Sequence, residues 1–436
     1  MAEPRRGPDV AKNIFVLALD AFNLEMLKGI DGAEHFRFHG LLEYGDLIRA
    51  REYPMRELLA RAEEQLRCFP GSIDGLIAYW DFPGSTIAPV LRRRFGLTGP
   101  SLESVLRCEH KYWSRLAQRQ VVPELIPRFY AVDPFADDPL AAIDIAFPFW
   151  LKPVRAHSSH LGFRIESEND FGRALRAIRR KLPRYAEPFN VLLEEADLPS
   201  EVASVDGYHC LAEEIISAER QCTLEGYVYK GRPRVYGIVD SLRNAHRSTF
   251  SRYQYPSTLS ADLRHRMIEA AEKVMRHIGF DNGPFNMEFF CDEATGRLSL
   301  LEINARVSKS HCPLFAMVEG ASHYEVAVNL AVGRQPRYPR GEGRFACAAK
   351  FMLRHFEDAR VLAVPGEERI RRLQAEMPEM LLRIEVEEGS LLSEMPDQDS
   401  YSYEYASLFI GGRDTADLER KYRRCRELLP FEFGPR

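Results

Sequence analysis

Apolar and polar positions alternate in blocks over the first hundred residues. The stretches "NIFVLAL" at 13–19 and "GLIAYWD" at 75–81 are nearly continuous apolar runs, which is typical of buried parallel strands. The segment "STIAPVLRRRFGLTGPS" at 85–101 predicts a helix that ends in a turn. Because strand and helix patterns follow one another, residues 1–104 are expected to form a small doubly wound, Rossmann-like domain.

Helix and strand patterns continue through the middle of the chain. Ser101 precedes apolar residues at helical spacing over 101–120, which predicts a capped helix, and a second helix is expected at 260–279, ending at Gly279. Strands are predicted within 147–154 and 208–216. The stretch "YVYKGRPRVYGIV" at 227–239 predicts a hairpin that turns at Lys230 and Gly231.

Two strands near residue 300 carry polar side chains at alternate positions. Asn286 and Glu288 lie two apart in "FNMEFF", and Glu302 and Asn304 lie two apart in "LSLLEINAR". Side chains two apart in a strand point to the same face of a sheet. If "EATG" at 293–296 joins these strands as a hairpin, their carboxylates and amides converge on one face.

The chemistry of that face favours a magnesium site formed by Glu288, Glu302 and Asn304, because Mg²⁺ prefers oxygen ligands. The alternative is an acidic face in water. It is less favoured because the neighbouring residues are apolar and burying two carboxylates without a cation is costly. Arg306 extends the face by one step and could clamp a phosphate or a carboxylate. The alternative for Arg306 is a structural ion pair with Glu302.

Two further stretches carry weaker signals. Lys152 ends the apolar strand in "FPFWLKPV", where its ammonium is well placed to contact phosphate oxygens, although a lysine at a strand end is usually snorkelling. The polar segment 155–162 that follows is of the kind that covers phosphates, but it has only one glycine, Gly162. The carboxylate pair in "LAEEII" at 211–216 could form the edge of an adenine slot.

Composition and charge exclude several classes of protein. The chain has 436 residues, 45% of them hydrophobic and 28% charged, with a formal net charge of −5. It is therefore long enough for two or three domains and gives no reason to expect a nucleic-acid partner. The first twelve residues lack the apolar core of a signal peptide, no stretch is apolar enough to span a membrane, and the eight cysteines form no C-x-x-C pair. A cytoplasmic protein without a zinc site or disulfide framework is the expectation.

Taken in order, the quoted stretches resemble the ATP-grasp superfamily over roughly residues 75–335, and the paired glutamates followed by E-x-N-x-R are the most specific part. The resemblance implies an α/β (α+β) fold. It comprises the Rossmann-like domain at 1–104, an ATP-grasp domain of two subdomains at 105–335, and a C-terminal α+β lid domain at 336–436. It also implies an ADP-forming ligase that uses ATP and Mg²⁺, with Mn²⁺ as a substitute. Such an enzyme activates a small-molecule carboxylate as an acyl phosphate for attack by an amine.

The resemblance assigns a role to individual residues. Lys152 and Arg306 are the expected catalytic residues, and Glu288, Glu302 and Asn304 the metal ligands. The residues expected to bind ATP are Lys111, Lys152, Ser158, Ser159, Glu213, Glu214, Ile215 and Ile216. The residues expected to contact the substrates are Arg243, Arg306, Ser308, Lys309 and His311.

Two other functions stay open. The stretch "VSKSH" at 307–311 resembles carbamoyl-phosphate synthetase, and His311 is shared with biotin carboxylase, so a bicarbonate-activating enzyme is the alternative. Ser310 stands where biotin carboxylase has a glutamate, and no glutaminase segment or biotinyl-lysine motif is seen, which disfavours this alternative. A regulatory module that binds a nucleotide without catalysis would lack the metal ligands, whereas all of the expected ligands are present in this sequence. No membrane partner is expected, and a homodimer is a further expectation.

Overall fold

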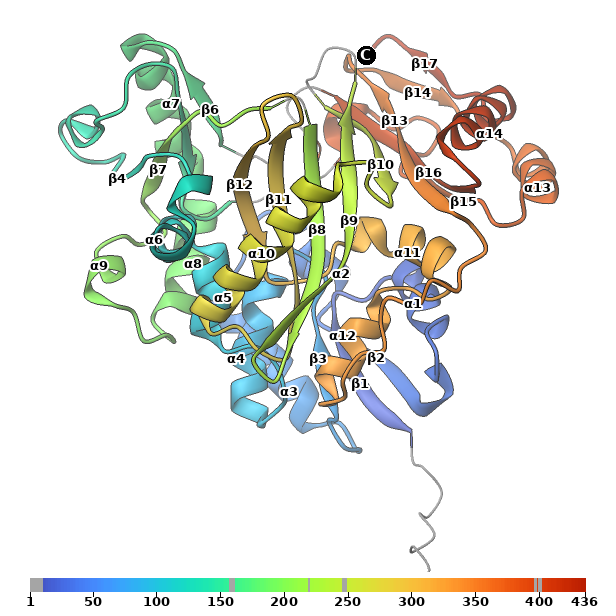
Figure 1. Ribbon diagram of the computed structural model, residues 1–436, viewed down its shortest axis with the longest axis horizontal. Helices are drawn as coiled ribbons and strands as arrows, with labels where there is room; N and C mark the ends of the chain where they lie inside the picture. The colour runs from blue at the N-terminus through green and yellow to red at the C-terminus, as the bar shows by residue number, and fades with distance from the viewer. Residues whose placement is uncertain (1–10, 157–160, 219, 245–248, 396–397, 399–401) are drawn as a thin grey trace, which may run out of the picture.

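A long antiparallel sheet of eight strands forms the centre of the molecule (Figure 1). The computed structural model describes residues 11–156, 161–218, 220–244, 249–395, 398 and 402–436. The strand order in the sheet is β12-β11-β8-β9-β10-β13-β16-β15. Its strands are β8 (Arg220–Tyr229), β9 (Arg232–Arg243), β10 (Phe250–Tyr255), β11 (Gly283–Asp292), β12 (Arg297–Asn304), β13 (Cys347–His355), β15 (Leu381–Ile384) and β16 (Tyr403–Gly412).

The N-terminal domain contains a three-stranded parallel sheet in the order β2-β1-β3. Its strands are β1 (Lys12–Leu17), β2 (Phe36–Leu41) and β3 (Gly75–Ile77), and its helices are α1 (Ala21–Lys28), α2 (Tyr44–Leu47), α3 (Met55–Arg67) and α4 (Gly84–Phe95). The two predicted apolar strands are confirmed, and so is the helix that follows the second. That helix ends at Gly96, which adopts the left-handed conformation suited to glycine.

The helical segment predicted at 101–120 is divided into α5 (Leu102–Glu109) and α6 (Lys111–Val121). Ser101 caps α5 by accepting a hydrogen bond from the Ser104 backbone, as its position predicts. His110 has an extended backbone and caps α6 through its ring, which accepts from the Trp113 backbone N–H. The predicted helical segment and its Ser101 cap are confirmed, and a second capping residue inside the apolar pattern divides the segment in two.

A small four-stranded sheet, in the order β4-β7-β5-β6, forms the second part of the central region. Its strands are β4 (Phe129–Val132), β5 (Phe149–Pro153), β6 (Phe163–Ile165) and β7 (Cys210–Glu214), and α7 (Glu168–Lys181), α8 (Pro183–Leu193) and α9 (Ser200–Ala203) accompany them. Phe149, Leu151 and Ala212 of this sheet pack with Phe171 and Ile178 of α7 in one buried cluster. This cluster holds the ends of β5 and β7 next to each other.

One turn and one helix position the strands of the large sheet. Lys230 and Gly231 both have positive φ, 49° and 71°, as a two-residue turn between twisted strands requires, so the predicted β8–β9 hairpin is confirmed. Helix α10 (Ala261–Ile278) begins after the cap Ser260 and ends at Gly279, also as predicted. Its apolar side packs on β8, β11 and β12 in one buried cluster (Figure 1).

The C-terminal segment continues the large sheet. Strand β13 pairs antiparallel with β10, from Arg252↔Phe351 to Tyr255↔Ala348. The segment also holds β14 (Arg360–Ala363), α13 (Glu367–Glu376), α14 (Thr415–Leu428) and β17 (Glu432–Gly434), while α11 (Cys312–Glu319) and α12 (Tyr324–Ala331) precede it. The chain thus has the mixed α/β fold that was expected. The large sheet contains strands from both sides of the predicted domain boundary at residue 335. The limits of the three domains therefore stay a prediction.

None of the helices within the described ranges combines the length and the apolar character needed to cross a bilayer. All eight cysteines are free, and only Cys68 is exposed.

Candidate active site

The polar face predicted near residue 300 lies on the β11–β12 hairpin. The two strands pair antiparallel, with Glu288 opposite Glu302 and Asn286 opposite Asn304. Opposed side chains on neighbouring strands are close enough to interact directly. Asn304 donates from Nδ2 to Asn286 Oδ1 at 3.0 Å, and Asn286 donates from Nδ2 to the Arg306 carbonyl at 2.9 Å. The predicted hairpin and its shared face are confirmed.

The electrostatics of this face fit a divalent cation. Burial, followed by the charge of Glu302, raises the pKa of Glu288 to about 7. A cation between the two carboxylates would offset both effects, because it supplies the opposite charge. Within the described residues the Oδ1 of Asn304 accepts no hydrogen bond, so the set offers two carboxylates and one amide oxygen. These are hard oxygen donors of the kind that Mg²⁺ takes.

Two lysines face this hairpin, each paired with a carboxylate. Lys111, the first residue of α6, lies 2.9 Å from Glu302 Oε1 and donates to the Ala156 carbonyl at 3.2 Å. Lys152 lies on β5, and its Nζ is 2.5 Å from Glu213 Oε2 on β7. Burial would raise the pKa of Glu302, but the ammonium groups of Lys111 and then Lys152 outweigh it and lower that pKa.

Glu213 is the centre of a buried ion-pair group rather than a free acceptor. Arg115 on α6 donates from Nε to Glu213 Oε1 at 2.6 Å, and both side chains are almost completely buried. The same guanidinium donates to the Leu300 and Leu301 carbonyls of β12 at 2.9 Å each. Burial acts to raise the pKa of Glu213, but Arg115 and Lys152 prevail and lower it to about 2. Arg115 therefore joins strand β7 of the small sheet to strand β12 of the large sheet.

These groups enclose a cavity of about 10 Å³, lined by residues that include Lys111, Lys152, Glu213 and Glu302. That space holds about one water molecule. A triphosphate bound here would pair with the ammonium groups of Lys111 and Lys152 in place of Glu302 and Glu213. A metal ion would pair with the carboxylate of Glu302. The charged groups of this site can therefore exchange their ion-pair partners when MgATP binds.

Arg306 lies in a second charged group that the sequence did not predict. Its guanidinium is 3.0 Å from Asp81, just beyond β3, so the alternative of a pair with Glu302 is wrong. Arg155 bonds the other Asp81 oxygen at 2.7 Å and Glu109 at 2.8 Å. One nitrogen of Arg306, one of Arg155 and one oxygen of Glu109 are buried without a hydrogen-bond partner within the described residues. The Asp81 and Glu109 carboxylates balance the two guanidinium groups, and the unpartnered nitrogen on each guanidinium is a donor that an anion can accept from.

The predicted adenine-side residues are only partly brought together. Glu214 pairs with Arg128 at 2.7 Å on the surface, and the Glu213 carboxylate is occupied as described. Ile215 and Ile216 lie just beyond β7 and are half-buried, and their place at an adenine slot stays a prediction. Ser158 and Ser159 lie outside the described residues.

The predicted substrate residues lie in different surroundings. Arg243 donates to Gln221 at 2.8 Å, and Gln221 donates to Glu288 at 2.9 Å, so Arg243 is linked to Glu288 through one side chain. His311 is buried, 2.9 Å from Glu225 Oε1, and faces away from solvent. The Ser308 carbonyl accepts from His323 at 3.1 Å. Lys309 and Arg243 each rest on an aromatic ring, Lys309 on that of Trp80 at 3.7 Å and Arg243 on that of Phe250 at 4.3 Å.

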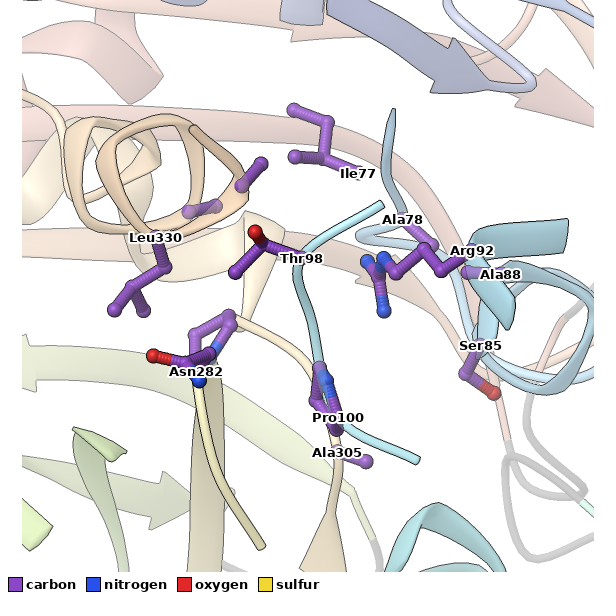
Figure 2. Close-up of a pocket in the computed structure, with 13 residues that line it drawn as sticks. Ile77, Ala78, Ser85, Ala88, Arg92, Thr98, Pro100, Asn282, Ala305 and Leu330 are labelled. Atoms are coloured by element: carbon purple, nitrogen blue, oxygen red, sulfur yellow. The ribbon is translucent and has the colours of Figure 1, made fainter. Parts of the chain in front are cut away.

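A separate cavity of about 20 Å³ lies between the N-terminal domain and the large sheet, and Figure 2 shows the residues that line it. Arg92 of α4 reaches into this cavity and donates from Nε to the Leu76 carbonyl at 3.0 Å. The rest of the lining is uncharged. The cavity has room for about one or two waters. It belongs to the packing between the N-terminal domain and the large sheet rather than to the charged site.

Known proteins resemble this chain in sequence over part of its length. Residues 145–313 match the family model of the ATP-grasp domain. The carbamoyl phosphate synthase large chain of Acidobacterium capsulatum is 25% identical over 240 residues, which are 54% of this chain and 20% of that one. The corresponding chain of Xylella fastidiosa is 40% identical over 76 residues, 17% of this chain and 7% of that one. The chain thus carries an ATP-grasp domain, and it spans at most a fifth of the length of these relatives.

Solved structures resemble it over nearly the whole chain. The L-amino acid ligase from Bacillus licheniformis has a TM-score of 0.71 at 14% identity, with 98% of this chain and 99% of that chain covered. Biotin carboxylase from Campylobacter jejuni has a TM-score of 0.66 at 15% identity, with 98% and 93% covered. These structures share the complete fold, including the N-terminal and C-terminal parts.

Proposed function

We propose that the protein is an ATP-dependent ligase that activates a small-molecule carboxylate as an acyl phosphate for attack by an amine, releasing ADP and phosphate. The observation that carries this proposal is the single face that holds Glu288, Glu302 and Asn304, with Lys111 and Lys152 directed at it. The match of residues 145–313 to the ATP-grasp domain supports the use of ATP.

The residues divide into three roles. Glu288, Glu302 and Asn304 would hold Mg²⁺, which supplies charge neutralisation for the phosphates of ATP. Lys111 and Lys152 bind the phosphate oxygens once they leave their carboxylate partners. Ile215 and Ile216 form the apolar side of the adenine slot.

Arg306 and Arg155 bind the anion that is being transferred. Phosphoryl transfer depends on positioning and on neutralising charge, so no protein nucleophile is required. Asp81 holds both guanidinium groups in place from the N-terminal domain. The carboxylate substrate enters beside Arg306, between the hairpin and the end of β3.

The test is ADP release measured across a library of amino acids and small carboxylic acids, with and without bicarbonate. ADP formed with particular acid and amine pairs supports the ligase. A bicarbonate-activating enzyme is the second candidate, because carbamoyl phosphate synthase chains and a biotin carboxylase are similar to parts of this chain or to its fold. ADP formed with no library member but stimulated by bicarbonate would replace the ligase by that candidate.

The remaining expectations belong to the same proposal. The enzyme acts in the cytoplasm on small molecules, without a nucleic-acid or membrane partner, and Mn²⁺ can replace Mg²⁺. Size-exclusion chromatography with light scattering tests the expected homodimer.

A further inference from the structure

The Lys309 side chain forms no ion pair with a carboxylate in the part of the chain that the structure describes. It follows Arg306 by three residues and lies with its Nζ 3.7 Å from the centre of the Trp80 ring. The ring is itself held by a hydrogen bond from its Nε1 to the Ala18 carbonyl at 3.0 Å and by an edge contact with Tyr44. A lysine on an aromatic ring is often a surface contact, but this one is partly buried where three parts of the chain meet.

The position of Lys309 relative to the reacting groups follows from two neighbouring contacts. Trp80 and Asp81 are adjacent in the chain, and they contact Lys309 and Arg306, respectively. Both lie beyond the carboxyl end of β3, which is where open parallel sheets bind their ligands. Ala18 and Leu42, just past the ends of β1 and β2, have positive φ angles of 51° and 56°, and such strain gathers at functional sites.

The charges around Lys309 come from both flanking domains. Arg383 and Glu385, joined at 2.6 Å, and Lys350 on β13, paired with Glu404 at 2.9 Å, face it from the C-terminal segment. Asp20 faces it from the N-terminal domain. Burial, followed by the charges of Arg383 and Lys350, lowers the pKa of Lys309 to about 7, although Glu385 and Asp20 act in the opposite direction. An amine with this pKa exists in good part uncharged near neutral pH, which suits a general base.

We infer that Lys309 is the general base that takes the proton from the amine substrate as it attacks the acyl phosphate. This inference rests on the proposed function. The nitrogen lone pair forms the new C–N bond, and the C–O bond to phosphate breaks, with its electron pair leaving on the phosphate. The proton lost by nitrogen passes to the uncharged Nζ of Lys309, which becomes an ammonium and later releases the proton to water. The Trp80 ring stabilises that ammonium.

The test compares two nucleophiles in one reaction. The full chain is incubated with ATP, Mg²⁺, an equimolar mixture of the protein amino acids, and hydroxylamine. Hydroxylamine is already uncharged at neutral pH and nucleophilic enough to attack without help from the protein, and it loses its proton to water. In Lys309→Met the ratio of amide to hydroxamate should fall by about 100-fold, the scale of general-base catalysis. Lys230→Met is the matched control, because Lys230 also lies over an aromatic ring, 5.2 Å from the centre of Tyr229, but on the surface. Its ratio should equal that of the wild type.

A second variant tests the inference with Lys309 in place. The rate of amide formation in the wild type should rise with pH through an apparent pKa near 7. Arg383→Met removes the cation that most strongly lowers the pKa of Lys309 and leaves Glu385, so this limb should move to higher pH.

The outcomes separate the two hypotheses. A wild type that forms neither hydroxamate nor amide overturns the proposed function, and the inference falls with it. A wild type that forms both, together with an unchanged product ratio in Lys309→Met or an unmoved limb in Arg383→Met, overturns the inference alone.

Discussion

Replacing Glu302 by glutamine removes one of the two opposed carboxylates while it keeps the size of the side chain. We expect kcat/KM for ATP turnover to fall by about 100-fold or more. The lost charge neutralisation is worth about 3 kcal/mol in a metal-assisted transition state. Glu288 then faces an amide, so its pKa should drop from about 7 towards its ordinary value of 4.5, because burial still raises it but the negative charge of Glu302 no longer does.

The same substitution should have little effect on folding. The Lys111–Glu302 pair lies at the rim of the site, with 14% and 32% of the two side chains exposed. Loss of such a pair costs about 1 kcal/mol or less, and relief of the repulsion between Glu302 and Glu288 offsets part of that cost. The melting temperature should therefore stay within a few degrees of the wild-type value.

The assay is coupled detection of ADP during a Mg²⁺ titration, together with a thermal melt followed by circular dichroism. Glu293→Gln is the matched control. It lies in the turn of the same hairpin, paired with Arg220, and should leave turnover unchanged. A Glu302→Gln enzyme that turns over within about threefold of the wild type would refute the assignment of this face. So would a loss of activity that comes only with loss of the fold.

Three further predictions concern the groups around this face. Burial acts to raise the pKa of Glu213, but Arg115 and Lys152 lower it to about 2 from an ordinary 4.5. Its stabilising effect is therefore complete above about pH 4.5 and lost as the pH falls towards 2, and Glu213→Gln should cost about 3 kcal/mol in urea unfolding at pH 7 but much less at pH 3. Equal costs at both pH values would contradict this. Lys152→Met should raise the KM for ATP by about tenfold or more, and an unchanged KM in initial-rate measurements would remove Lys152 from the phosphate site. Arg306→Lys keeps the charge but loses the planar fork, so kcat should fall by about tenfold or more; full activity would mean that only its charge matters.

Local patterns in the sequence were enough to predict the β11–β12 hairpin. Its residues lie within 22 positions of one another, and a period of two with a short turn fixes both the register and the shared face. The Lys230–Gly231 turn and the caps of α10 were predictable for the same reason. Each depends on the conformational preferences of a few neighbouring residues.

The second charged group could not be predicted in this way. Asp81, Glu109 and Arg155 come from three segments that only the packed fold brings to Arg306. Asp81 carried one usable signal, its place at the end of an apolar parallel strand. The partners of Lys152 and Glu213 were missed because the sequence does not show that β5 and β7 are neighbours.

The hydrogen bonds between β10 and β13 have a mechanical consequence. A segment that shares backbone hydrogen bonds with the large sheet cannot swing open without breaking that ladder. Among the described residues the small sheet β4-β7-β5-β6 shares no strand pairing with the large one, and Arg115 links the two through side-chain bonds. We therefore expect any hinge motion that admits a nucleotide to move the small sheet. A chain cut after residue 335 would leave β10 as an unprotected strand edge, and we expect it to aggregate rather than to yield a smaller working enzyme.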